Sequence, residues 1–142
     1  MARFSTLEAL RQWACPIRTP YRDNGKKHMN SRTILRTTQT ISDQPIALPQ
    51  KNPEVVVSIL EIDPGAELPP HQHPFARYGY ILSGTLSVTN LETGKVMTFQ
   101  SGAFVVESMA QWHSGTNPGL QPLKILILDQ VEEGMENIIL GE

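Results

Sequence analysis

Hydrophobic and polar positions in this chain follow the two-residue alternation of β-strands rather than the spacing of helices. Runs rich in β-branched and aromatic residues recur at short intervals, with Gly, Pro, Asp and Asn between them. Many short strands, with no βαβ alternation and no internal repeat, predict an all-β sandwich or barrel. We expect the strands at residues 32–41, 54–62, 77–83, 85–90, 96–100, 103–108, 112–117 and 123–130.

Turn-forming residues mark the ends of several of these strands. Residues 43–45 (Asp-Gln-Pro) and 63–65 (Asp-Pro-Gly) close the first two, and the strand at 54–62 is expected to be the more buried of the pair. Gly84 and residues 92–94 (Glu-Thr-Gly) are expected to turn two hairpins. Eleven Pro and ten Gly in 142 residues agree with short strands rather than long helices.

The two ends of the chain differ from this β-rich part. Residues 4–14 show helical spacing of apolar side chains and a capping box at Ser5 and Glu8, and a polar loop follows. Met29 is an alternative start of the protein, with the preceding residues as an upstream extension. The acidic C-terminal tail could pack Ile138, Ile139 and Leu140 on the barrel, and the sequence leaves its conformation open. We expect an N-terminal extension at residues 1–30, a barrel at 31–130 and a tail at 131–142.

Charge is unevenly distributed, although the net charge of −2 is ordinary. Residues 1–50 contain eight Lys or Arg and three acidic residues, whereas the remainder contains four and eleven. A basic arm could bind nucleic acid, but these charges are dispersed among few aromatic residues, so we expect a solvated segment and no nucleic-acid partner. No apolar run reaches the ~20 residues of a membrane span or forms a signal peptide, and Cys15 stands alone. We therefore expect a cytoplasmic protein with no membrane partner.

Three of the four histidines lie in the β-rich part, namely His71, His73 and His113. His71 and His73 are two positions apart, so on a strand their rings project from the same face. Imidazole is the commonest metal-binding side chain, and a distant third histidine could complete a site once the sheet folds over. A His-x-His pair is a weak signal by itself, so its surroundings decide the interpretation.

The surroundings of these histidines resemble the two sequence motifs of the cupin superfamily. Residues 65–84 resemble the first motif and residues 102–117 resemble the second, within a similarity that covers about residues 50–130. The resemblance implies a small single-domain cupin, which is a double-stranded β-helix (jelly-roll) barrel with the histidines near one mouth. It also implies a divalent metal ion (Fe, Mn, Ni, Zn or Cu) held by His71, His73 and His113.

The sequence departs from the cupin pattern at three positions. The first motif usually supplies a glutamate ligand seven residues before its closing glycine, and here that position is Arg77. Ser108 and Ala110 replace the usual proline and glycine of the second motif. Three neutral histidines would leave positions open to water or substrate, as a catalytic metal requires. The alternative is a decayed metal site whose histidines are satisfied by hydrogen bonds.

Four further residues are candidates for the site. Glu107 interrupts an apolar run, where a carboxylate is costly unless it is paired or metal-bound. It could replace the missing ligand, orient a histidine or act as general base, or else lie exposed at a strand end. Arg77 could hold an anionic substrate group if it points inward, whereas a one-residue shift in register would turn Tyr78 inward instead. Trp112, beside His113, is the aromatic residue that we expect to touch a ligand.

These features favour a metal-dependent enzyme, dioxygenase-like or an isomerase, that acts on a small organic molecule, with Glu107 and Arg77 as candidate catalytic residues. The alternative is a non-catalytic cupin that binds or senses a small ligand or a metal, because this barrel hosts many chemistries. A purely structural barrel without metal is a third interpretation. By resemblance to small cupins, and because twofold symmetry is the commonest arrangement, we expect a homodimer.

Overall fold

The computed structural model describes residues 30–142. The chain divides into two units, Met1–Thr37 and Thr38–Glu142, and all the strands found among the described residues lie in the second. The helix predicted at residues 4–14 and the alternative start at Met29 lie outside the described residues. Residues 30–142 contain no helix, and therefore none with the length and apolar character needed to span a membrane.

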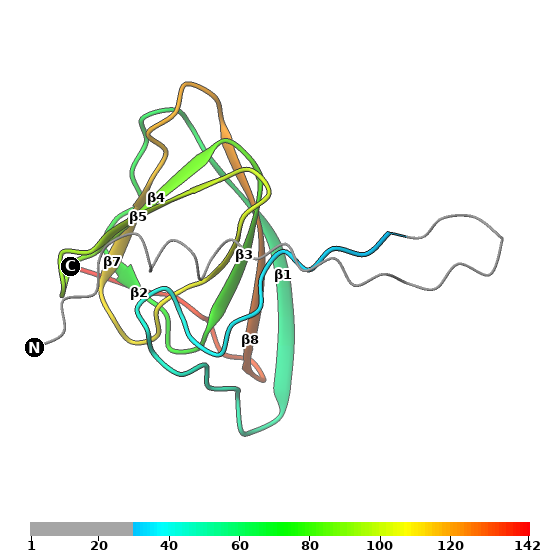
Figure 1. Ribbon diagram of the computed structural model, residues 1–142. Helices are drawn as coiled ribbons and strands as arrows, with labels where there is room; N and C mark the ends of the chain where they lie inside the picture. The colour runs from blue at the N-terminus through cyan, green and yellow to red at the C-terminus, as the bar shows by residue number, and fades with distance from the viewer. Residues whose placement is uncertain (1–29) are drawn as a thin grey trace, which may run out of the picture. The chain divides into compact units, whose positions relative to one another are not determined.

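Two antiparallel sheets make up the second unit (Figure 1). One sheet has the order β1-β8-β3-β6, and the other has the order β5-β4-β7-β2-β9. This arrangement confirms the predicted all-β jelly-roll barrel. The strands are β1 (Pro53–Ile62), β2 (His71–Gln72), β3 (Arg77–Ser83), β4 (Thr85–Asn90), β5 (Val96–Gln100), β6 (Phe104–Val106), β7 (His113–Thr116), β8 (Leu123–Glu132) and β9 (Ile139–Leu140).

Strand β8 shows why the sequence pattern produces a core. Every second residue from Leu123 onward is buried, so one face of the strand is turned into the barrel. On that face Ile125 lies opposite the fully buried Ile81 of β3. Burial of one such side chain stabilises the fold by about 1.5–3 kcal/mol. The alternation that predicted the strand therefore also determines which of its residues form the core.

Gly84 corrects one expectation about the hairpins. It connects β3 to β4, which lie in different sheets, so it carries the chain from one sheet to the other rather than closing a hairpin. Its φ is +82°, and a Cβ atom at this position would lie 2.8 Å from the Cα atom of Leu123. Only glycine fits both constraints. Residues 92–94 do turn the β4–β5 hairpin, as predicted.

Two predicted strands differ from the structure. Residues 32–41 form no continuous strand; Gln39 makes an isolated antiparallel bridge with Pro45, across a turn in which the Thr40 N–H donates to the Gln44 carbonyl (2.9 Å). β-branched residues favour a strand only where a partner strand lies beside them. Strand β1 forms where it was predicted, but most of it is exposed rather than buried. Within the described residues it pairs with β8 alone and forms an edge of its sheet.

Candidate metal centre

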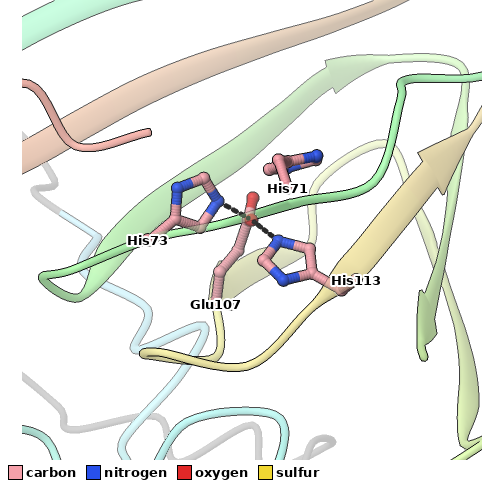
Figure 2. Close-up of side chains that lie close together, drawn as sticks. All are labelled: His71, His73, Glu107 and His113. Atoms are coloured by element: carbon pink, nitrogen blue, oxygen red, sulfur yellow. Dashed lines mark hydrogen bonds and ion pairs between the residues drawn. The ribbon is translucent and has the colours of Figure 1, made fainter. Parts of the chain in front are cut away.

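Four side chains from both sheets converge inside the barrel (Figure 2). His71 lies in β2, His73 follows that strand directly, and His113 begins β7, opposite His71 in the strand register. Glu107 follows β6. All four residues are buried, with exposed fractions of 0–8%. One donor atom from each lies within 4.8 Å of those of the others, so the group could hold a metal ion.

Each histidine ring is oriented by a backbone carbonyl. The Nδ1 atoms of the three rings, in chain order, lie 2.7, 2.6 and 2.8 Å from the carbonyl oxygens of Pro69, Asn137 and Gln111. A carbonyl only accepts, so Nδ1 carries the hydrogen, and the neutral ring keeps its lone pair on Nε2. Proteins commonly orient metal-binding histidines in this way.

The carboxylate of Glu107 meets two of these rings at their lone-pair side (Figure 2). Its Oε2 atom lies 2.9 Å from Nε2 of His73 and 3.3 Å from Nε2 of His113. Carboxylate oxygens and the unprotonated Nε2 atoms are all hydrogen-bond acceptors, so such close contacts require a proton or a metal ion between them. In the metal-free protein a proton can fill that role, and a divalent ion suits the same donors.

Burial and neighbouring charges shift the pKa values of the cluster. Burial alone would raise the pKa of Glu107, but hydrogen bonds and charges from His113 and His73 outweigh it and hold that pKa well below its usual value. Burial opposes a charge on His113 too, yet the bond to Glu107 and its charge leave the pKa of His113 raised. Burial lowers the pKa of His71, which keeps this ring neutral and able to bind a metal.

Glu107 also stands beside the position where the cupin motif usually carries its glutamate. Its backbone N–H donates to the carbonyl of Arg77 (2.8 Å), so the two residues face each other where β6 ends against β3. A carboxylate therefore enters the cluster from the neighbouring strand, at the level of the position that Arg77 occupies. The sequence marked Glu107 as unusual, but only the pairing of β3 with β6 places it here.

Arg77 lies on the interior face of β3, which it shares with the buried Gly79 and Ile81. Its Nε and Nη2 atoms each donate to a carboxylate oxygen of Asp129, both at 2.9 Å. The guanidinium thus points inward but is paired with a carboxylate of the same chain. Sequence reasoning missed Asp129, although its position on the otherwise apolar face of β8 is a signal that could have found it.

Tyr78 and Trp112 lie outside the four-residue cluster. Tyr78 follows Arg77 in β3 and so occupies the opposite face, where its ring centre is 6.4 Å from that of Phe104. Burial raises the pKa of Tyr78. Trp112 is half-buried and its backbone N–H donates to the Glu92 carboxylate (3.0 Å). Contact of either ring with a ligand stays a prediction.

The turn that joins Glu107 to His113 is strained at Ala110. This residue has a φ of +50°, in the left-handed region that glycine adopts at little cost. Its N–H donates to the carbonyl of His73 (2.8 Å), so the turn is fastened to the histidine segment. The replacement of the motif's usual glycine by Ala110 therefore keeps the same backbone shape at a cost in conformational energy.

Residues 58–129 match the family model described as Cupin domain. Among curated proteins no match was found. Solved structures with a similar fold include the polyketide cyclase RemF from Streptomyces resistomycificus, with 20% identity and a TM-score of 0.52 over 66% of each chain. Oxalate decarboxylase from Bacillus subtilis is 24% identical with a TM-score of 0.50, over 63% of this chain and 24% of that one.

A third similar structure is the oxalate decarboxylase of Lactobacillus farciminis in its formate complex, 26% identical with a TM-score of 0.49. It is covered over 26% of its own length, against 61% of the present chain. The chain therefore spans about a quarter of the length of the decarboxylases that it matches. At these similarities RemF and the Bacillus subtilis oxalate decarboxylase support the fold alone.

Proposed function

The chain belongs to the cupin domain family, and from this premise we propose that it binds one divalent metal ion through His71, His73 and His113, with Glu107 as fourth ligand. One observation carries the proposal. One donor atom from each of the three histidines and from Glu107 converges in a buried place, while the Nδ1 atom of each ring lies against a backbone carbonyl. Metal–nitrogen bonds of about 2.1 Å to a single ion would place the donor atoms at separations comparable with those found in this cluster.

We further propose that the chain is a metal-dependent enzyme. Its substrate would be a small organic molecule with anionic oxygen atoms. A bound ion would supply a Lewis acid for such oxygens. Glu107 neutralises only part of a divalent charge, and Asp129 already neutralises Arg77, so the cluster retains positive charge that favours an anionic ligand. Imidazole and carboxylate ligands suit Fe, Mn, Ni, Zn and Cu, so the donor set alone does not identify the metal.

Metal analysis of the purified protein tests the ligand assignment. We expect close to one equivalent of a transition metal in the unmodified chain, and its loss in His113→Ala. His28→Ala is the matched control, because this histidine lies outside both motifs. Full metal content in His113→Ala, or equal loss in the two variants, would refute the assignment.

Turnover separates an enzyme from a binding module. Protein reconstituted with Fe(II), and separately with Mn(II), Ni(II), Zn(II) or Cu(II), is offered diketones, catechols and flavonols while oxygen uptake and product formation are followed. Turnover that depends on one metal and is lost in His113→Ala supports an enzyme. Tight binding of these molecules without turnover by any metal form supports the alternative, a cupin that binds or senses a small ligand.

We also propose that the chain forms a homodimer. The edge strand β1 exposes apolar side chains on both faces, among them Val55, Val56 and Val57 with 43–58% of their surface exposed. Burial of such an edge against a second copy would remove apolar area from water and pair free strand edges. Light scattering across a concentration series measures the mass, and a monomer at every concentration would contradict the proposal.

A further inference from the structure

The end of the C-terminal tail (residues 133–142) lies along β2, the strand that contains His71 and directly precedes His73. Strand β9 pairs with β2, with Leu140 opposite His71, and the Gly141 N–H donates to the carbonyl of Pro70 (2.8 Å). The side chains of β9 are 47–60% exposed. Backbone hydrogen bonds, more than apolar burial, therefore hold this end of the tail.

Asn137 is the buried residue of the tail, with only 4% of its surface exposed. Its backbone carbonyl accepts the Nδ1 hydrogen of His73 at 2.6 Å. Its side-chain oxygen accepts the Phe75 N–H (2.9 Å), and its amide nitrogen donates to Asp129 (2.6 Å). The side chain thus anchors the backbone carbonyl that orients the ring.

Through its hydrogen bonds, Asn137 connects the ion pair of Arg77 and Asp129 to the pair of His73 and Glu107. Asp129 receives the guanidinium of Arg77 and the amide of Asn137, while His73 faces Glu107 through its other nitrogen. The carbonyls that orient the other two histidines come from Pro69 and Gln111, each two residues before its ring. His73 is different because its orienting carbonyl comes from 64 residues away in the sequence.

We propose that Asn137 is a positioning residue for His73, through which the order of the C-terminal tail controls the affinity of the metal site. With Asn137 in place, the Nδ1 hydrogen of His73 is fixed and Nε2 faces the cluster. When the tail separates from β2, that constraint is lost. Because linkage is reciprocal, metal binding in turn holds the tail in place. This inference rests on the proposed metal site.

The test compares Asn137→Ala with Glu136→Ala, an exposed neighbour in the same tail. Long-range ¹H–¹⁵N correlation spectra of the metal-free proteins, at a pH where the rings are neutral, report which nitrogen of His73 carries the hydrogen. We expect an Nδ1–H tautomer in the unmodified protein and in Glu136→Ala, and a mixture of tautomers in Asn137→Ala. An unchanged tautomer in Asn137→Ala would overturn the positioning role even if the protein binds no metal.

Titration calorimetry with Zn²⁺ gives the second readout. We expect Asn137→Ala to bind Zn²⁺ about 10–100-fold more weakly than Glu136→Ala, the range usual for residues that orient metal ligands. Equal Zn²⁺ affinity in the two variants overturns the control by the tail. Failure of the unmodified protein to bind any metal overturns the proposed function instead, so the two failures are distinguishable.

Hydrogen exchange at the Gly141 amide keeps the inference testable if Asn137→Ala does not fold. In the unmodified protein we expect Zn²⁺ to slow exchange at this amide at least several-fold, whereas a surface hairpin amide such as that of Lys95 should change little. Unaltered exchange at Gly141 in protein shown to be loaded with Zn²⁺ would contradict the coupling.

Discussion

Two buried carboxylates, Glu107 and Asp129, lie in the same barrel interior and have opposite kinds of surroundings. Asp129 receives two hydrogen bonds from Arg77 and one from the amide of Asn137. Glu107 faces the Nε2 atoms of His73 and His113, whose Nδ1 hydrogens are already used. The first carboxylate is satisfied by donors of its own chain, whereas the second requires a proton or a metal ion.

The difference separates a structural charge from one suited to ligand binding. A buried ion pair whose hydrogen bonds are all made is tolerated in the folded protein. Removal of one partner leaves the other as an uncompensated buried charge. A buried carboxylate among acceptors is stable only with an added cation, which is the property of a metal ligand. The same residue type, buried to a similar extent at 8% and 6% exposure, therefore has two roles.

Removal of the charge of Glu107 should strongly weaken metal binding. In Glu107→Gln we expect Zn²⁺ affinity to fall about 100-fold or more, beyond the range of residues that only orient ligands. The metal-free variant should remain folded, because the histidines can release the extra proton. Calorimetric titration measures the affinity, with the exposed Glu67→Gln as control. Wild-type affinity in Glu107→Gln would place Glu107 outside the metal ligands.

The same change at Asp129 should act on stability. Asp129→Asn leaves the inward-pointing Arg77 without its partner, and we expect a loss of about 3 kcal/mol in the free energy of unfolding. Denaturant unfolding of metal-free protein measures it. The control is Glu61→Gln, which breaks an exposed pair with Lys124 and should cost at most about 1 kcal/mol. Equal losses in the two variants would show that the buried pair of Arg77 and Asp129 stabilises the fold no more than the exposed pair of Lys124 and Glu61.

The stability of the chelator-treated protein should depend on pH, because Glu107 and His113 hold a proton between them in the folded state. The pKa of His113 is raised, so its contribution is fully present below its ordinary value of 6.5 and is lost as pH rises through the folded pKa. The pKa of Glu107 is lowered, so its contribution is present above 4.5 and is lost as pH falls through the folded pKa. Their joint contribution should therefore be complete only between pH 4.5 and 6.5.

Thermal unfolding across pH, compared between unmodified protein and Glu107→Gln, isolates this contribution. As pH falls through the folded pKa of His113, this stabilising contribution increases whereas Zn²⁺ affinity decreases, because a proton on His113 competes with the metal. Superimposable stability profiles for the two proteins would mean that Glu107 and His113 share no stabilising proton.

The smallest expected effect concerns the turn that follows Glu107. Ala110→Gly should raise the free energy of unfolding by about 1 kcal/mol, because it removes the left-handed strain of a residue with a Cβ atom. Chemical denaturation measures the gain, and Ala103→Gly, in the turn between β5 and β6, is the control that should lose stability. Destabilisation of Ala110→Gly would show that the positive φ carries no strain.

Much of the fold could be predicted from local pattern. The alternation in β8 and the turn at residues 92–94 appear as expected, because side-chain period and turn chemistry are properties of adjacent residues. The prediction for residues 32–41 was wrong for the same reason. Its β-branched residues have strand propensity, but the residues form isolated bridges, such as that between Gln39 and Pro45, rather than a continuous ladder.

By itself, the sequence determined the family, most of the strand positions and the three motif histidines, because side-chain alternation and motif spacing are read directly along the chain. Only the tertiary structure decided which groups surround those histidines. The pairing of β3 with β6 puts Glu107 beside the position of Arg77, and the return of the tail brings Asn137 to His73. Register between segments far apart in the chain depends on packing of the whole barrel, which no local pattern encodes.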